Sequence, residues 1–345
     1  MPSLLRLIGV TLAAGGAVFA QTPALTVQPA GTTALLQAVS VSRTNPDVVW
    51  VSGHAGTWSR TLDGGRTWKA SVVTGRDSLQ FRDLHAVDAN RAWLMAAGTG
   101  DKSGIFRTVD GGVSWTHDFV NRDTSAFYDC MAFWDDSTGF AFSDAVKAQM
   151  PLARTTNGRD WSVSMLPGQD SEGGFAASGT CALATPQGAA WIGTGAAAVP
   201  RVLRSRDRGL TWSAVAVPLV GGNGAGITGL AFRDALNGVA VGGVISGTAS
   251  GPRAARSTDG GATWTLIPDP ALTGSAYGVA YGSAAGVPVL IAVGPGGASW
   301  SRDDGATWAV LDAAPYWSVG CAGSGPCWLV GPKGRVVRVD WGAAR

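Results

Sequence analysis

Glutamate is almost absent from the sequence: Glu172 is the single example among 345 residues, and charged residues of all kinds amount to only 14%. Glycine is abundant, with 50 residues. Since Glu favours helices and Gly disfavours them, this composition argues against long surface helices. The formal net charge of +2 provides no strong overall field for nucleic acid or an anionic membrane surface.

Metal and cofactor motifs are also missing. The three histidines, His54, His85 and His117, have no metal-ligand spacing between them, and no Cys-x-x-Cys pair is present. We interpret His54 and His117 as loop or surface residues. The sequence contains no Gly-x-Gly-x-x-Gly after an expected strand, no P-loop, no Gly-x-Ser-x-Gly and no His-Glu-x-x-His. No metal and no cofactor is therefore predicted.

The first 20 residues have the pattern of a secretory signal: Arg6, an apolar stretch, and small residues ending at Ala20. We expect cleavage there, export to a periplasm or the extracellular space, and a single mature domain over residues 21–345. An even number of cysteines suits an oxidising compartment. Cys321 and Cys327 are spaced to close a short hairpin, whereas the pairing of Cys130 with Cys181 stays open.

One phrase, Ser/Thr-x-Asp-x-Gly-x-Thr/Ser-Trp, recurs along the chain. Its Asp can accept hydrogen bonds from the backbone of a tight turn, and its Gly can adopt positive φ. Near-identical sites at regular intervals indicate a scaffold rather than catalysis. The copies are Thr61–Trp68, Thr108–Trp115, a shortened Thr155–Trp161, Ser205–Trp212, Ser257–Trp264 and Ser301–Trp308, with the turn residues Asp63, Asp110, Asn157, Asp207, Asp259 and Asp303.

The spacing of these copies predicts an all-β, seven-bladed β-propeller. The Trp residues that end them are 44 to 52 residues apart, which is the length of a four-stranded propeller blade. A second phrase, a short apolar strand ending in small residues, occurs seven times, from Val49–Gly53 to Trp328–Gly331. The seventh unit is one strand short, so we expect the segment Ala24–Gln28 to close the ring and remove free sheet edges.

The mature chain resembles the photosystem II stability/assembly factor-like propellers of the BNR or Asp-box, sialidase-like, repeat group. Besides the boxes, the resemblance rests on four stretches: Phe81–Leu84, Phe133–Asp136, Gly139–Asp144 and Glu172–Thr180. It implies a non-catalytic ring that binds a partner protein, as an assembly or stability factor for a membrane or periplasmic complex does. We expect a monomer that is not embedded in a membrane.

The alternative is a glycosidase, since sialidases share the box. A sialidase needs a Tyr nucleophile with a Glu partner, and no Tyr in this sequence is tied to Glu172. Asp83, Asp129 and Asp144 could still supply the carboxyl pair of another glycan hydrolase. A third possibility is an uncharacterised enzyme that uses these carboxylates with a bound cation. The expected ligand is thus a protein partner or a glycan.

Positions that break the repeat are the best candidates for a site. Ser143-Asp144 stands where other copies of the apolar phrase end in Gly. The starts of the innermost strands align as Gln37, Asp83, Asp129, Thr180, Thr228, Tyr277 and Trp317, and these are expected to ring one mouth of the channel. We predict that Asp83, Asp129, Asp144 and Glu172 face one another there, with Arg82 at the rim. The full set of candidate binding residues is Arg82, Asp83, His85, Tyr128, Asp129, Ser143, Asp144, Glu172, Tyr277 and Trp317.

Overall fold

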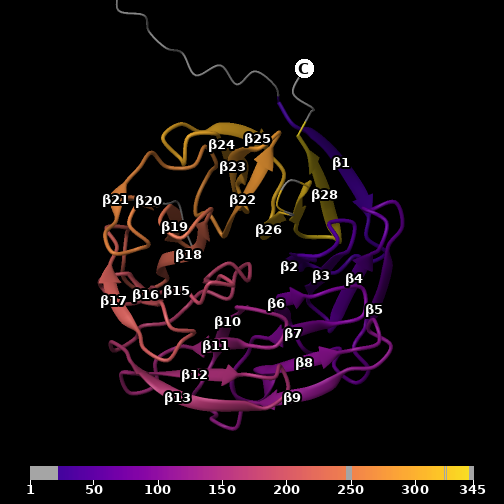
Figure 1. Cartoon of the computed structure of the whole chain (residues 1–345), viewed down its shortest axis with the longest axis horizontal. Coiled ribbons are helices and arrows are strands. Elements are labelled where there is room, and N and C mark those ends of the chain that lie inside the picture. The colour runs from indigo at the N-terminus through magenta and orange to yellow at the C-terminus, as the bar shows by residue number, and fades with distance from the viewer. Residues whose placement is uncertain (1–21, 246–250, 322, 324, 342–345) are drawn as a thin grey trace, which may run out of the picture.

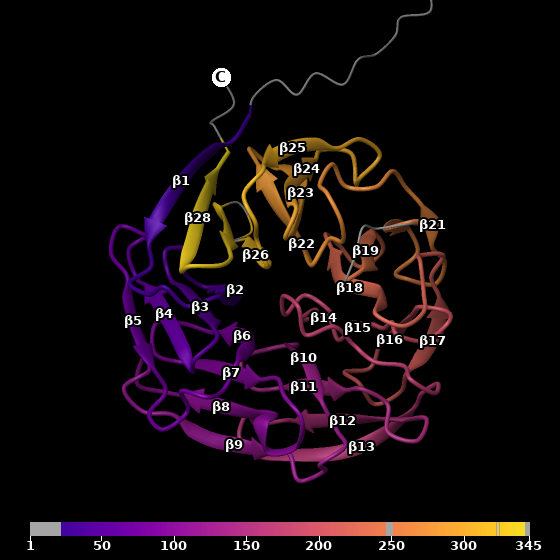
Figure 2. The ribbon, with the colours of Figure 1, turned by 180° about the vertical axis from the view of Figure 1, so that it is seen from behind.

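Seven four-stranded antiparallel sheets stand around a central axis in the computed structural model, which describes residues 22–245, 251–321, 323 and 325–341 (Figures 1 and 2). The prediction of an all-β, seven-bladed propeller is confirmed. The expected signal segment, residues 1–20, lies outside the described residues, as does the cleavage site after it.

Each blade is a simple meander from the axis outwards, apart from the seventh. The innermost strands are β2 (Leu36–Val41), β6 (Phe81–Ala86), β10 (Tyr128–Phe133), β14 (Ala182–Ala184), β18 (Ala225–Phe232), β22 (Gly278–Ala284) and β26 (Ser318–Cys321). The second strands are β3 (Val49–Gly53), β7 (Ala92–Ala96), β11 (Gly139–Ser143), β15 (Ala190–Gly193), β19 (Gly238–Val244), β23 (Val287–Gly294) and β27 (Cys327–Val330).

The two outer positions complete each sheet. The third strands are β4 (Thr57–Thr61), β8 (Gly104–Thr108), β12 (Gln149–Thr155), β16 (Arg201–Ser205), β20 (Ala254–Ser257), β24 (Gly297–Ser301) and β28 (Arg335–Asp340). The outermost are β5 (Lys69–Val72), β9 (Thr116–Val120), β13 (Trp161–Pro167), β17 (Ser213–Ala216), β21 (Thr265–Leu266), β25 (Ala309–Asp312) and β1 (Ala24–Pro29). One short 3₁₀ turn, η1 (Gly100–Lys102), lies between β7 and β8.

The N-terminal strand closes the ring. β1 pairs antiparallel with β28, from Ala24 opposite Asp340 to Pro29 opposite Arg335. Figure 1 shows this junction as indigo beside yellow. The last blade therefore contains both ends of the described chain, and its sheet order is β1-β28-β27-β26. This pairing covers the outer side of β28 and holds the two ends of the ring together.

The hydrophobic core is divided into seven clusters, one at each interface between neighbouring blades. The Trp at the end of each repeated turn packs against the preceding blade. Trp115 of the second blade, for example, has its ring 6.2 Å from that of Trp50 and 6.0 Å from that of Trp58 in the first. In the last blade, which lacks the turn, Trp341 packs 5.5 Å from Trp300 instead. These indoles hold the blades together.

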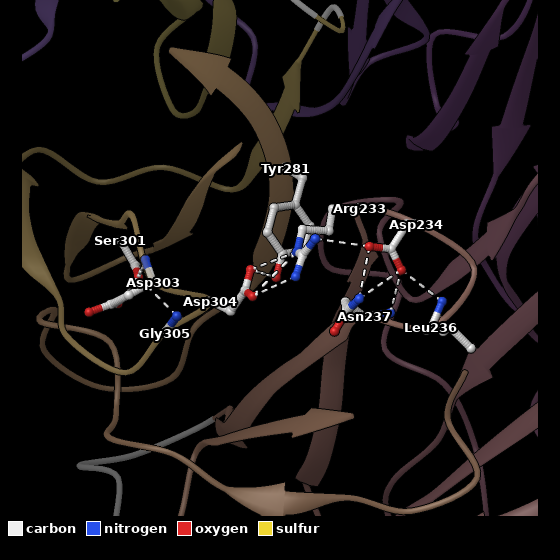
Figure 3. Close-up of polar contacts among 9 residues, drawn as sticks. All are labelled: Arg233, Asp234, Leu236, Asn237, Tyr281, Ser301, Asp303, Asp304 and Gly305. Atoms are coloured by element: carbon white, nitrogen blue, oxygen red, sulfur yellow. Dashed lines mark hydrogen bonds and ion pairs between the residues drawn. The ribbon is translucent and has the colours of Figure 1, made fainter. Parts of the chain in front are cut away.

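The repeated turns satisfy their own polar groups, as Figure 3 shows for the sixth blade. Ser301 Oγ donates to Asp303 Oδ1 at 2.8 Å, and the Gly305 amide donates to Ser301 Oγ at 2.8 Å. The amide and the hydroxyl of Thr307 donate to the two Asp303 oxygens at 2.8 and 2.6 Å. The equivalent donors lower the pKa to about 2 in four other turns, at Asp63, Asp110, Asp207 and Asp259. In the shortened turn, Asn157 accepts from the amides of Arg159 and Asp160.

One turn residue also joins two blades. Asp304, with φ of +55°, accepts from Arg233 Nη2 at 3.0 Å and from the Tyr281 hydroxyl at 2.9 Å. Arg233 also donates to Asp234, which caps the turn to Asn237 (Figure 3). This network connects the fifth blade to the sixth, on the side of the ring away from Asp129 and Asp144.

All four cysteines are in disulfides. Cys130 of β10 pairs with Cys181, just before β14, and the bond links the third and fourth blades. Cys321 pairs with Cys327 across the β26–β27 turn, and we call this bond the hairpin disulfide.

Candidate functional site

One pocket lies where the innermost strands begin, and we call it the mouth pocket. Its volume is about 420 Å³, within the range usual for small-ligand sites. Blades one, two, three, five, six and seven contribute to its wall, together with the segment between β13 and β14. The lining residues are Leu35, Gln37, His54, Arg82, Phe127, Asp129, Asp144, Gly174, Phe175, Ala176, Ala177, Ile245, Tyr277 and Trp317.

Three of its polar residues sit on β-bulges. The register of β2 with β3 shifts at Gln37, that of β6 with β7 at Arg82, and that of β10 with β11 at Asp129. A bulge leaves one residue unpaired and re-aims its side chain. The equivalent residue in each of the first three blades is therefore turned into the mouth pocket.

The bulge in the second blade corrects the predicted alignment. The bulge position shows that Arg82, and not Asp83, is equivalent to Gln37 and Asp129. Side chains alternate along a strand, so an alignment error of one residue assigns a side chain to the opposite face of the sheet. Asp83 is 4% exposed and lies outside the pocket wall; it accepts from the amides of Leu84 at 2.7 Å and Met131 at 2.6 Å. Burial raises its pKa to about 8 in spite of these donors. Asp83 thus fastens the second blade to the third.

The segment between β13 and β14 crosses the ring and covers part of the channel (Figure 2). Ser178 Oγ donates to the Tyr277 carbonyl at 2.7 Å, and Ser318 Oγ donates to the Ser178 carbonyl at 2.6 Å. Arg82 Nη1 donates to the Ala176 carbonyl at 3.5 Å. The segment therefore contacts the second, sixth and seventh blades, and we call it the crossing segment, residues 168–181.

Glu172 anchors this crossing segment and does not face the mouth pocket, contrary to the sequence prediction. Its side chain is fully buried. Its carboxylate accepts from Arg201 Nε at 2.8 Å, from Thr194 Oγ1 at 2.7 Å and from the Gln169 amide at 2.8 Å, and it forms an ion pair with Arg201. These donors occupy both carboxylate oxygens and supply the partners that a buried charge needs.

Asp129 and Asp144 do meet, as predicted. Their carboxyl groups are hydrogen-bonded to each other, and the Gly174 amide donates to both, at 3.3 Å to Asp129 Oδ2 and at 3.0 Å to Asp144 Oδ1. Burial raises the pKa of Asp129 well above its usual value, and the Asp144 charge raises it further. Burial also raises the pKa of Asp144. Two carboxyls in one site repel when both are ionised, so the pair holds a proton to higher pH than a lone carboxyl does.

His54 was missed as a site residue, and the strand register explains why. Gly53 of β3 pairs with Leu36 just as Ser143 of β11 pairs with Tyr128. His54 is therefore equivalent to Asp144, and both residues line the mouth pocket. Burial, followed by the charge of Arg82, lowers the pKa of His54.

Two polar atoms of the pocket have no hydrogen-bond partner among the described residues. They are Gln37 Oε1, in a residue only 4% exposed, and His54 Nε2. Buried polar atoms normally find partners. Both residues line the mouth pocket, although these two atoms are themselves buried.

Aromatic side chains form the other side. Tyr277 and Trp317 pack edge to face with ring centres 5.6 Å apart, and both are half-buried. Phe127 and Phe175, which the sequence did not single out, are also half-buried in the wall. Carboxyl groups, an amide and aromatic rings thus converge on one concave site.

Three other candidates have structural roles. His85 stacks on Phe133 at 4.5 Å within the interface between blades two and three, and burial lowers its pKa to about 3. Tyr128 is 2% exposed and packs against Phe119 on the same interface. Ser143 Oγ accepts from the Phe127 amide and donates to the Asp144 carbonyl, both at 3.0 Å, which positions Asp144. None of the three lines the mouth pocket.

Solved structures with the same architecture are known. The chain has the fold of YCF48, a photosystem II assembly factor. A structure of YCF48 bound to a D1 peptide is 15% identical, with a TM-score of 0.63 over 93% of this chain and 97% of that one. YCF48 from Cyanidioschyzon merolae gives the same score and identity over 92% and 99%. The Pan2 WD40 domain of Neurospora crassa has a TM-score of 0.63 at 12% identity over 94% and 96%.

These identities establish the fold alone. No protein-family model matches the chain, and the search of curated proteins found no match. Within the described residues, no helix has the length and apolar character to cross a membrane, and no group of three or more His, Cys, Asp or Glu side chains is arranged to hold a metal ion. The function must therefore be argued from the mouth pocket.

Proposed function

We propose that this chain is an exported, non-catalytic binding protein that captures a segment of a partner protein in the mouth pocket. The observation that carries the proposal is the pocket itself. It combines buried polar atoms without partners, Gln37 Oε1 and His54 Nε2, with half-buried aromatic rings. Pockets of this kind bind extended ligands by inserting side chains and offering a few directed hydrogen bonds.

The fold is consistent with this role. YCF48, which has the same architecture, has been solved with a bound D1 peptide. The crossing segment supports the proposal too, because it contributes Gly174, Phe175, Ala176 and Ala177 to the pocket wall from a part of the chain outside the repeats. The resemblance to assembly-factor propellers implies the same function, in the assembly or stability of a membrane or periplasmic complex.

The carboxyl pair favours binding over glycan hydrolysis. Retaining glycosidases keep their two carboxyls roughly 5–5.5 Å apart so that one can attack while the other donates a proton. Asp129 and Asp144 are hydrogen-bonded directly to each other and share the Gly174 amide. Such contact leaves no space for a sugar carbon between them. The Tyr closest to the pair, Tyr128, is buried against Phe119 and is not free to attack.

The experiment is a peptide selection with a matched pair of variants. A random 12-residue display library is selected on residues 21–345 at pH 7.5, and affinities of the enriched peptides are measured by fluorescence anisotropy. Trp317→Ala should weaken binding at least roughly tenfold, as loss of an aromatic anchor typically does. Leu210→Ala, at a residue 71% exposed on a repeated turn, should leave affinity unchanged. Peptides that bind both variants equally would refute the proposal.

Export is a separate part of the proposal, supported by the signal pattern over residues 1–20 and by the two disulfides. The intact mass of the protein purified from a bacterial host's periplasm should correspond to a chain that begins at Gln21. Retention of residues 1–20 in cytoplasmic protein would contradict it.

A further inference from the structure

The mouth pocket contains hydrogen-bond acceptors that no described cationic side chain pairs with. Gln37 Oε1 is buried and has no partner in the described chain. Asp129 and Asp144 add two carboxyl groups, and neither forms a salt bridge with any described residue. An occupant that satisfies these atoms must therefore bring N–H or O–H donors.

Arg82 lines the same pocket but is already engaged. Its Nε and Nη2 both donate to Gln80 Oε1, and its Nη1 donates to the Ala176 carbonyl. Burial lowers its pKa, and Asp129 opposes that effect at longer range. Arg82 therefore moderates the charge of the carboxyl pair without neutralising it through a direct hydrogen bond.

The aromatic wall also favours a cation. Tyr277 and Trp317 meet edge to face at 5.6 Å, and Phe127 and Phe175 complete the wall. The face of an aromatic ring carries partial negative charge and attracts guanidinium and ammonium groups. Acceptors on one side and π faces on the other are the two contacts that a basic side chain makes when it is held in a pocket.

We propose that the mouth pocket anchors a basic side chain, arginine or lysine, of the partner segment, with the cation between the Asp129–Asp144 pair and the Tyr277–Trp317 wall. The inference rests on the proposed function and specifies the partner's chemistry. The cation takes the place of the proton that the two carboxyls share. Binding therefore releases a proton to solvent.

This exchange predicts the pH dependence of binding. The pair has pKa values above the usual carboxyl range, so protons and the basic group compete, and affinity should rise with pH from about 5 to 8. The other titratable groups around the pair are Arg82, His54 and Tyr277. Arg82 and Tyr277 keep their charge state over this interval, and the pKa of His54 is lowered, so it stays neutral over most of it.

The test uses the peptides selected above on the full mature chain. Enriched pocket-dependent peptides should contain a Lys or Arg, and replacing Arg by the neutral isostere citrulline should lower affinity roughly tenfold or more. The Asp144→Asn variant should lower affinity for the Arg peptide by a similar factor, abolish the difference between Arg and citrulline, and flatten the pH dependence. The matched control is Asp170→Asn, which changes an exposed carboxylate on the same crossing segment. It should leave the affinity, the difference between arginine and citrulline, and the pH dependence unchanged.

The outcomes separate the two proposals. If peptides bind in a Trp317-dependent way but citrulline binds as tightly as arginine, or affinity rises as pH falls, the basic anchor is refuted and peptide binding stands. If the enriched peptides instead require a free carboxylate and lose binding in Arg82→Gln, the pocket is an anion receptor and the inference is wrong. If no peptide distinguishes Trp317→Ala from the parent, both proposals fail. Circular dichroism of each variant confirms that it is folded.

Discussion

Replacing Glu172 by Gln should destabilise the chain substantially, because this residue is the buried anchor of the crossing segment. The carboxylate receives donors from Arg201, Thr194 and Gln169. The N–H groups of Gln169 and Arg201 now donate to the carboxylate. In Glu172→Gln, the new NH₂ group would face these N–H groups and could not accept from them. The guanidinium of Arg201, whose side chain is only 17% exposed, would lose its counter-charge.

The expected cost follows from the burial of the pair. Breaking a buried ion pair by removing one partner typically costs about 3–5 kcal/mol, because an unpaired charge stays in the interior. For a chain of this size such a loss lowers the melting temperature by about 4–7 °C. Glu172→Gln should therefore melt well below the parent. Asp170→Asn, which changes an exposed carboxylate two residues away, should have the melting temperature of the parent.

Urea unfolding of four proteins gives the decisive measurement: the parent, Glu172→Gln, Arg201→Met and the double variant. If the pair is structural, each single variant loses stability and the double variant recovers part of the loss, since neither buried charge is then left alone. The reasoning would be refuted by a Glu172→Gln protein with unchanged stability that had lost peptide affinity, because Glu172 would then act in binding.

Three further results are expected. Trp264→Ala should cost about 3–5 kcal/mol of unfolding free energy and leave peptide affinity unchanged; a loss of affinity at constant melting temperature would contradict a purely structural role. In the loop-entropy model, breaking the Cys130–Cys181 bond, which spans 51 residues, should lower the free energy of unfolding by about 4 kcal/mol, and breaking the hairpin disulfide should lower it by about 2 kcal/mol. Thermal melting of the two Cys→Ala double variants measures both losses. The pKa of Asp83 is about 8 in the folded state and about 4 in the unfolded state, so the folded state binds more protons between these two pH values. The free energy of unfolding should therefore fall as pH rises from 5 to 8, and the fall should be smaller in Asp83→Asn. A free energy of unfolding that rises over this interval would contradict the assignment.

The repeats allowed the fold to be predicted from the sequence. Each blade must bury one apolar face against the next, so the repeated turn and the apolar second strand recur at blade length. The strand that closes the ring was predictable because the seventh unit ended one strand short, and β1 fills that position. The role of Trp341 was not predicted, since it follows no repeated turn and is recognised only by its packing on Trp300.

The crossing segment could not be placed from the sequence. It belongs to no repeat, and its position depends on hydrogen bonds to blades that are distant in the chain, such as that from Ser318 to Ser178. The single Glu was noticed as unusual, but its partner is Arg201 on β16, and no local pattern connects the two. The pair Asp129 and Asp144 was found because both lie in one blade, where the hairpin register brings them together.

The candidate site shows where repeat alignment fails as a guide to function. Alternation along an inner strand predicts which residues face the neighbouring blade, and a bulge reverses that prediction for one residue without changing the pattern around it. Arg82 and Asp83 are adjacent, yet one lines the mouth pocket and the other is buried between blades. The irregularity is therefore in the backbone. The same bulge occurs in the first, second, third and fifth blades, while the residue placed there differs each time: Gln37, Arg82, Asp129 and Thr228, of which the first three line the mouth pocket. A shared bulge with divergent side chains gives one scaffold a chemically asymmetric mouth, and the proposed binding of a single ligand in one orientation requires such an asymmetry.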